Sequence, residues 1–428
     1  TVNRMTPVAN TQAILLGNFA GQALDDIINR GDDYDWRDTF RSNFKDKVME
    51  YSTCRDLNKK DDFRTAALNQ AKNIQEIVDE LFNNEGYNRT KTILEPSFVC
   101  EQLGLQGRVD LMTTDFHLLV EQKSGGNYNI QRNFLNKYGS YQKEEHYVQL
   151  LLYYGILHYN FHLGNNTVNA RLLYSKYPLP GGLVVVNFYQ SLFREAIKFR
   201  NMAVAKEYGM AQEGFNGVME DLSPETLNEN GCLSKLFMEY QRPQIEKVTR
   251  PLHELSSLEH AYFSRMMTFV YREELASRIG ATEGQGNCIA DMWNMPLTEK
   301  IETGNIYTAL RITNKKKSNE YNGFDTITLT PQESSLSEEV SFLPNFRKGD
   351  SIYLYSYKEG EEPDARRALL FKGSLIGIKS DELIVHLNDG QQNPNLFKDE
   401  LYAIEHSSSD GNTSSAIRSL HRFISAPK

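Results

Sequence analysis

The hydrophobic periodicity of this chain changes three times, and each change limits the folds that the chain can adopt. Apolar side chains recur at helical spacing in roughly the first 90 residues and again from about 188 to 300. Between these regions, residues 93–187 have the pattern of short strands around one helical segment at 146–161. After residue 302, short alternating segments separated by Gly, Asn and Asp are typical of a small barrel or sandwich. The sequence therefore predicts an α/β fold with added helices, followed by a small C-terminal β domain.

The C-terminal β segments are expected where apolar and polar residues alternate between turn residues. The expected strands are 306–312, 326–329, 351–355, 369–378 and 382–387. The last twenty residues are rich in serine and are expected to be mobile.

Composition and charge exclude several classes of protein. With 47 Lys and Arg against 56 Asp and Glu, the net charge is −9. This acidic balance argues against a protein that coats nucleic acid through its overall charge, although a local basic groove is compatible with it. No apolar run approaches the ~20 residues of a membrane-spanning helix, so we expect no membrane association.

The cysteines indicate a reducing environment. They lie far apart in the sequence and form no C-x-x-C pair, so neither structural zinc nor a disulfide framework is expected. We therefore expect reduced thiols in a cytoplasmic protein. The four residues are Cys54, Cys100, Cys232 and Cys288.

Two adjacent segments of the central region predict a β-hairpin. Residues 108–112 and 116–123 are rich in strand-forming residues and flank a Thr-Thr-Asp turn. Because side chains alternate along a strand, Glu121 and Lys123 point to one side, and the residue between them points to the other. If the two segments pair, Asp110 comes to the same side as Glu121.

Asp110, Glu121 and Lys123 are the candidate catalytic residues. Two carboxylates a few ångströms apart repel each other unless a cation lies between them, and their oxygens suit Mg²⁺ or Mn²⁺. A nearby ammonium orients a metal-bound water and stabilises the charge that develops on a phosphate. An E-x-K pair alone is typical of a surface ion pair, but here it ends the apolar run 118–120 and lies at hairpin distance from Gly-Arg-Val-Asp. This combination predicts a site for phosphodiester hydrolysis.

The helix at 146–161 carries a polar stripe that can serve the same site. His146, Gln149 and Tyr153 lie at positions i, i+3 and i+7 and therefore share one face of the helix. A glutamine and a tyrosine one turn apart can hold a phosphate or a base beside a metal site. The alternative interpretation is that Tyr153 belongs to an amphipathic core.

These residues resemble a known family. Asp110, Glu121-x-Lys123 and Gln149-x-x-x-Tyr153, in this order and spacing, resemble the PD-(D/E)xK nucleases of the RecB-type branch, in which the Q-x-x-x-Y element is characteristic.

A narrower resemblance covers most of the chain from about residue 65. The segments Gly104–Asp110 and Glu121–Gly125 are similar to the replication helicase–nucleases that trim Okazaki-fragment flaps. In that family a β-barrel follows the nuclease, and Phe346–Asp350, Phe371–Gly373 and Tyr402–His406 resemble its recurring segments.

The resemblance implies a domain organisation. Residues 1–302 would form a restriction-endonuclease-like PD-(D/E)xK core with helical extensions, and residues 303–428 would form the accessory β-barrel. A superfamily 1 helicase motor would lie elsewhere on the intact polypeptide, because no G-x-x-x-x-G-K-[ST] motif occurs in this chain.

The resemblance also implies roles for individual residues. Asp110, Glu121, the backbone carbonyl of Gln122 and Glu95 would be metal ligands, and Lys123 would be the catalytic lysine. The residues implied to contact DNA are His146, Gln149 and Tyr153.

Two departures from the family pattern affect the expected cofactors. RecB-type enzymes usually carry a metal-binding histidine on the helix before the strands, whereas the helix expected at 65–82 has none. Gln75 is the best match to that position and would leave a weaker metal site, or one completed by Glu95. Many relatives also hold an iron–sulfur cluster, but the cysteines here are too far apart, so Mg²⁺ or Mn²⁺ is expected without a cluster.

The function expected from these observations is metal-dependent hydrolysis of single-stranded or flap DNA by the N-terminal part of a helicase–nuclease. One alternative is a nonenzymatic module that binds single-stranded DNA through a decayed nuclease site. Another is a nuclease that acts on RNA or on foreign duplex DNA.

Overall fold

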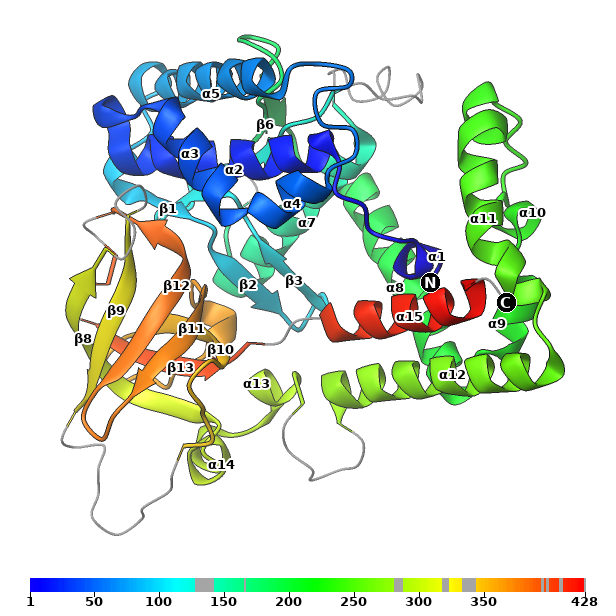
Figure 1. Cartoon of the computed structure of the whole chain (residues 1–428). Coiled ribbons are helices and arrows are strands. Elements are labelled where there is room, and N and C mark those ends of the chain that lie inside the picture. Colours follow the sequence, from blue (N-terminus) through cyan, green and yellow to red (C-terminus); the bar gives the residue numbers. More distant parts are fainter. Residues whose placement is uncertain are drawn as a thin grey trace. The chain divides into compact units, whose positions relative to one another are not determined.

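The computed structural model describes residues 1–127, 142–164, 167–280, 288–317, 323–332, 344–393, 396–397, 400–407 and 411–426 (Figure 1). The chain forms two compact units. The helical unit comprises Thr1–Ala9, Lys198–Asn294 and Ser408–Lys428, and the sheet-and-barrel unit comprises Asn10–Ile197 and Met295–Ser407. This division differs from the boundary expected between residues 302 and 303, because the barrel and the central sheet belong to one unit.

A five-stranded sheet forms the centre of the sheet-and-barrel unit. The strands lie in the order β1-β4-β5-β6-β7, and all neighbours are antiparallel except β5 and β6. Parallel neighbours need a crossover, and helix α7 (Glu144–Phe161) lies between these two strands in the sequence. The strands are β1 (Thr92–Leu94), β4 (Leu111–Thr113), β5 (Leu118–Lys123), β6 (Asn169–Tyr174) and β7 (Leu183–Val186).

Helices cover both faces of this sheet. Leu118 and Val120 of β5 pack in one apolar cluster with α2 (Gln12–Arg30) and α5 (Phe63–Asp79). Leu119 points the other way and packs in the cluster that contains the buried side chains of α7. Both clusters exclude water from the sheet and hold the strands at fixed positions.

Shorter elements complete this layer. The helices α3 (Trp36–Asp46) and α4 (Val48–Thr53) follow α2, and a two-stranded ribbon consists of β2 (Ser97–Cys100) and β3 (Leu105–Arg108). The expected strand at 108–112 is therefore divided, because β3 ends at Arg108 and β4 begins at Leu111.

The expected C-terminal β domain is a closed six-stranded barrel, which leaves no open sheet edge. All five strands expected there occur, and β13 is an additional strand that closes the barrel between β8 and β10. The strands are β8 (Ile306–Lys316), β9 (Phe324–Pro331), β10 (Ser351–Tyr357), β11 (Phe371–Ile378), β12 (Leu383–Gln391) and β13 (Leu401–His406).

Hydrogen bonds join the end of β12 to the central sheet. The Gln391 side-chain amide bonds both the N–H and the carbonyl of Leu94, at 3.1 and 2.8 Å. The Asn393 amide donates to the carbonyl of Thr92 at 2.7 Å, and the Asn29 amide of α2 donates to the carbonyl of Gly390 at 3.1 Å. These buried bonds fix β12 relative to β1 and α2 within the unit.

The helical unit contains a capped long helix as expected from the sequence. Helix α12 (Ser257–Ile279) begins with the capping box of Ser256 and Glu259 and ends at Gly280. The apolar core includes Phe215, Phe263, Met267 and Ile417. The other helices here are α1 (Val2–Met5), α9 (Asn216–Asp221), α10 (Pro224–Leu227), α11 (Arg242–His253) and α13 (Asp291–Asn294), and α8 (Gln190–Gln212) begins in the other unit's residues.

The expectation of a mobile C-terminus is wrong for residues 411–425, which form helix α15. Ile417 and Ile424 are buried in the core of the helical unit, and Leu420 packs against it. The spacing of these three residues gives one apolar helical stripe, which the surrounding serines and charged residues obscure.

A buried ion pair in the barrel provides a test of this fold. The Lys300 ammonium of α14 (Leu297–Glu302) lies 2.8 Å from Glu405 of β13, which also accepts a hydrogen bond from the Tyr355 hydroxyl. Replacement of Glu405 by Ala removes the carboxylate from a buried ammonium, and we expect a loss of about 3 kcal/mol or more in the free energy of unfolding.

Urea denaturation followed by circular dichroism measures this loss. The control is Glu359→Ala, because Glu359 is 82% exposed and its ion pair with Arg311 is weak at 3.6 Å. Equal stability of the two variants would contradict the structural role of the buried pair.

Candidate functional site

The predicted hairpin is present, and it brings Asp110 to Glu121. Leu111 pairs with Val120 and Met112 with Leu119, so Asp110 comes immediately before the paired part of β4. The Asp110 carboxylate accepts a hydrogen bond of 2.6 Å from the backbone N–H of Gln122. The turn before β2 adds Glu95, whose N–H donates to the backbone carbonyl of Asp110 at 3.1 Å.

Glu121 lies at the centre of a hydrogen-bond network on the α7 side of the sheet. Its Oε1 accepts bonds from Lys123 Nζ at 2.7 Å and from Gln149 Nε2 at 2.8 Å. The residue is only 3% exposed, and its Oε2 has no hydrogen-bond partner among the described residues. A buried carboxylate oxygen of this kind suits a cation.

Gln149 and Tyr153 lie together beside this carboxylate. Gln149 Nε2 is 2.9 Å from the Tyr153 hydroxyl, which donates to the backbone carbonyl of Arg108 at 2.7 Å. A Cβ on Gly107 would lie 2.5 Å from the Tyr153 ring, so only glycine leaves room for this contact. In this structure the two side chains orient the carboxylate and the β3 backbone.

His146 lies near the end of β5. Its Nδ1 is 2.9 Å from the hydroxyl of Tyr174. Burial, together with the positive charge of Lys123, lowers the pKa of His146 to about 4, so its imidazole is neutral at pH 7.

The side chain of Gln122 points away from the carboxylates, as strand alternation predicts. Its amide donates to Ser175 Oγ at 2.8 Å, and Ser175 donates to Gln70 of α5 at 2.6 Å. Gln70 also donates to the carbonyl of Ser124 at 3.0 Å. Any contribution of Gln122 to the site therefore comes from its backbone.

Gln75 is a predicted site residue that the structure does not bring to the carboxylates. It is exposed on α5 and follows Ile74, which points into the core. The sheet-facing stripe of α5 includes Gln70, Ala71 and Ile74, so Gln75 lies off this stripe. Gln70 is the residue of this helix that reaches the end of β5.

Glu95 also belongs to a second group of carboxylates, and the sequence analysis does not identify the other two members of this group. Oxygens of Asp25 on α2, Glu95 and Asp389 at the end of β12 all lie within 4.8 Å of one another. The Arg108 guanidinium lies between two of them, with Nε 2.6 Å from Glu95 and Nη1 3.7 Å from Asp389.

The signals for these two residues are weak in the sequence. Asp389 occurs in Asn-Asp-Gly, which is typical of a hairpin turn, and Asp25 is one of two adjacent aspartates on an amphipathic helix.

Burial raises the pKa of the carboxylates in both groups, and the Asp110 charge raises it further in the other four. Burial is the main cause in each, and it raises the pKa of Glu95 and of Glu121, with the Asp110 charge as the next cause in both. The same effect of burial raises the pKa of Asp25, Asp110 and Asp389. A divalent cation at Asp110, Glu121 and Glu95 would offset this repulsion, and the donor set fits Mg²⁺ or Mn²⁺.

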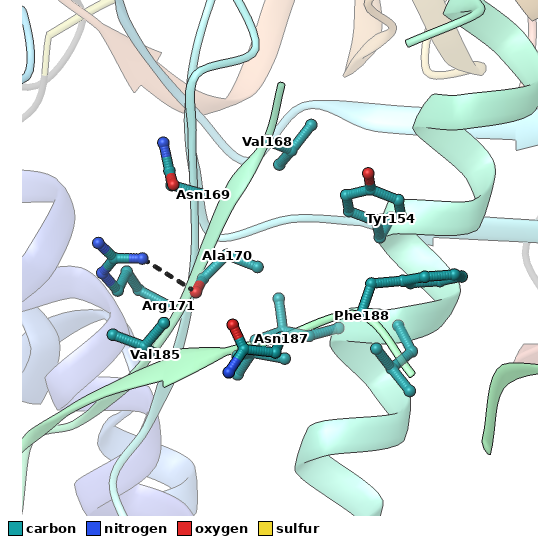
Figure 2. A pocket seen from close by; sticks show the side chains of 11 residues that line it. Tyr154, Val168, Asn169, Ala170, Arg171, Val185, Asn187 and Phe188 are labelled. Carbon is teal, nitrogen blue, oxygen red and sulfur yellow. Dashed lines mark hydrogen bonds between the residues drawn. The ribbon is translucent and has the colours of Figure 1, made fainter. Parts of the chain in front are cut away.

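A cavity of about 490 Å³ lies elsewhere in the same unit, between α7, β6 and β7 (Figure 2). Its lining includes the stacked rings of Tyr154 and Phe188, with centroids 4.7 Å apart, and Arg171. None of the predicted site residues lines it.

Comparison with known proteins gives no family for this chain. No protein-family profile matches it, and no curated protein sequence matches it. The resemblance to RecB-type nucleases therefore rests on the residues quoted above.

Two other expectations concern the whole chain. In the part that the structure describes, no helix is both long enough and apolar enough to cross a bilayer. The four cysteines are free thiols, as expected.

The raised pKa of Glu121 gives a prediction for stability. A carboxyl whose pKa is higher in the folded protein stabilises the fold below its ordinary pKa of about 4.5, and this contribution is lost as the pH rises. Glu121→Gln mimics the protonated form. We therefore expect Glu121→Gln and the wild type to have equal free energies of unfolding near pH 4.5. At pH 8 without divalent cations, we expect the variant to be more stable than the wild type by about 1 kcal/mol or more.

Thermal unfolding in EDTA across this pH range measures the difference. Glu145→Gln is the matched control on α7, because that side chain is 68% exposed. A pH-independent difference between Glu121→Gln and the wild type would contradict the prediction.

Proposed function

We propose that this chain is a metal-dependent nuclease that hydrolyses phosphodiester bonds of single-stranded or flap DNA, built on a PD-(D/E)xK restriction-endonuclease-like core. The observation that carries the proposal is the arrangement around Glu121. One hairpin holds Asp110, Glu121 and Lys123 together, and Gln149 binds the same carboxylate from the neighbouring helix.

The metal ligands in this proposal are Asp110, Glu121 and Glu95. Mg²⁺ or Mn²⁺ bound there supplies Lewis acidity and an activated water for attack on phosphorus. The unpartnered Oε2 of Glu121 supports this choice of ligands, and Glu95 also belongs to the trio Asp25, Glu95 and Asp389, whose oxygens lie within 4.8 Å of one another.

The side chains around the ligands have separate tasks. Lys123 Nζ, held at 2.7 Å from Glu121, donates hydrogen bonds to the phosphate as negative charge develops on its oxygens. Gln149 keeps the Glu121 carboxylate in one orientation, and Tyr153 fixes Gln149 and the end of β3. Neutral His146, two turns before Tyr153 on α7, can accept or donate a hydrogen bond to DNA without adding charge.

The proposed substrate follows from the burial of the site. Glu121 is almost fully buried, and a flexible single strand can enter a recessed site more readily than a stiff duplex. DNA is therefore the proposed partner, in a cytoplasmic protein with reduced thiols. A helicase motor on the same polypeptide is supported by the sequence resemblance alone.

Cleavage of end-labelled single-stranded DNA tests the proposal. We expect cleavage with Mg²⁺ or Mn²⁺, none with EDTA, and a loss of about 100-fold or more in Lys123→Ala and Glu121→Gln. Lys91→Ala is the control, because the Lys91 side chain is 43% exposed, lies in the same unit and is paired with Asp115. We expect this control to cleave at the wild-type rate.

Other outcomes separate the alternatives. Salt-sensitive binding of single strands without cleavage in either metal would indicate a nonenzymatic binding module. Faster cleavage of matched RNA or duplex DNA would change the substrate class. Wild-type rates in Lys123→Ala would show that the site assignment is wrong.

A further inference from the structure

Arg108 forms an ion pair with the proposed metal ligand Glu95, but the proposed function assigns it no task toward the substrate. Its Nε forms an ion pair with Glu95 Oε2 at 2.6 Å and its Nη1 lies 3.7 Å from Asp389, yet 48% of its side chain stays exposed. The two carboxylate side chains are only 12% and 23% exposed. Arg108 thus lies at the border between the buried acidic group and solvent.

The barrel holds one of these two carboxylates in place. Asp389 is followed by Gly390 and Gln391, whose hydrogen bonds to Asn29 and Leu94 fix the end of β12 against α2 and β1. Asp389 therefore cannot move independently of the central sheet, although it is almost 300 residues away from Glu95 in the sequence.

The acidic surroundings create a difficulty for a DNA substrate, and Arg108 is suited to relieve it. DNA phosphates are repelled by Asp25, Glu95 and Asp389 unless a cation at the rim attracts them. Lys123, which is paired with Glu121, serves the scissile phosphate in the proposed function, so a neighbouring phosphate needs a second cation. A guanidinium offers N–H groups in a planar fork that matches phosphate oxygens, so it can keep its bond to Glu95 and still bind a phosphate.

We infer that Arg108 binds a backbone phosphate of the DNA strand beside the scissile bond, and that Asp389 of the barrel is a positioning residue that holds this guanidinium in place. The inference rests on the proposed function, since it concerns the same DNA strand. It gives the barrel a direct part in the nuclease site.

Equilibrium binding of a fluorescent single-stranded oligonucleotide in EDTA tests the two roles without cleavage. We expect Arg108→Gln to raise the dissociation constant about tenfold, as for loss of a charge-assisted contact. Arg108→Lys keeps the charge without the fork and should fall between this variant and the wild type. Asp389→Asn should weaken binding about threefold.

A double-variant cycle shows whether Asp389 acts through Arg108. We expect Asp389→Asn to add nothing in the Arg108→Gln background, because the group that it positions is gone. Additive effects would overturn the positioning role. The controls are Asp381→Asn, an exposed acid on the barrel, and Arg367→Gln, an arginine that is 76% exposed.

Kinetics and folding separate this role from a merely structural one. Under cleavage conditions, Asp389→Asn should raise KM more than it lowers kcat, and its thermal unfolding should match that of Asp381→Asn. Should Arg108→Gln fail to fold, Arg108→Lys carries the test, and wild-type binding by that variant overturns the phosphate role.

Failure of this inference differs from failure of the proposed function. If the wild type cleaves DNA while Arg108→Gln binds and cleaves like it, the inference is wrong and the function stands. If the wild type binds without cleaving and Arg108→Gln binds more weakly, the function is wrong and the phosphate contact stands. Absence of binding by the wild type overturns both.

Discussion

Repulsion between partly buried carboxylates is the constraint on which this structure depends. Asp25, Glu95, Asp110, Glu121 and Asp389 come from five different segments, and besides burial the Asp110 charge raises the pKa of the other four. Apolar contacts must hold them together, and the two faces of the central sheet supply these contacts through α2, α5 and α7. The free energy gained by burying apolar side chains therefore offsets the electrostatic cost of holding these five carboxylates close together.

The parts of the site that sequence could predict are those that local periodicity determines. Alternation along one strand places Glu121 and Lys123 on one side and Gln122 on the other, and a short turn brings Asp110 to them. Helical spacing likewise places Gln149 and Tyr153 together. The barrel strands follow from the same alternation, whereas β13 acquires its place only by pairing with both β8 and β10.

The parts that sequence could not predict depend on contacts between distant segments. The three-residue context of Asp389 is typical of a hairpin turn, whereas the hydrogen bonds of Gly390, Gln391 and Asn393 to distant segments bring Asp389 to Glu95. Gln75 is the best match to the family's histidine position, but it lies off the stripe of α5 that faces the sheet. Helix α15 looked mobile because its serines dominate the composition, while three apolar residues at helical spacing determine its packing.

The path of the chain through the two units has a consequence for synthesis. The chain enters the helical unit three times, at 1–9, at 198–294 and finally at 408–428, so the helical unit cannot be finished until its last segment has left the ribosome. All of the sheet-and-barrel unit precedes residue 408, and it can complete its core earlier. Until α15 is synthesised, the growing chain carries a complete sheet-and-barrel unit, while the helical unit still lacks Ile417 and Ile424 of its core.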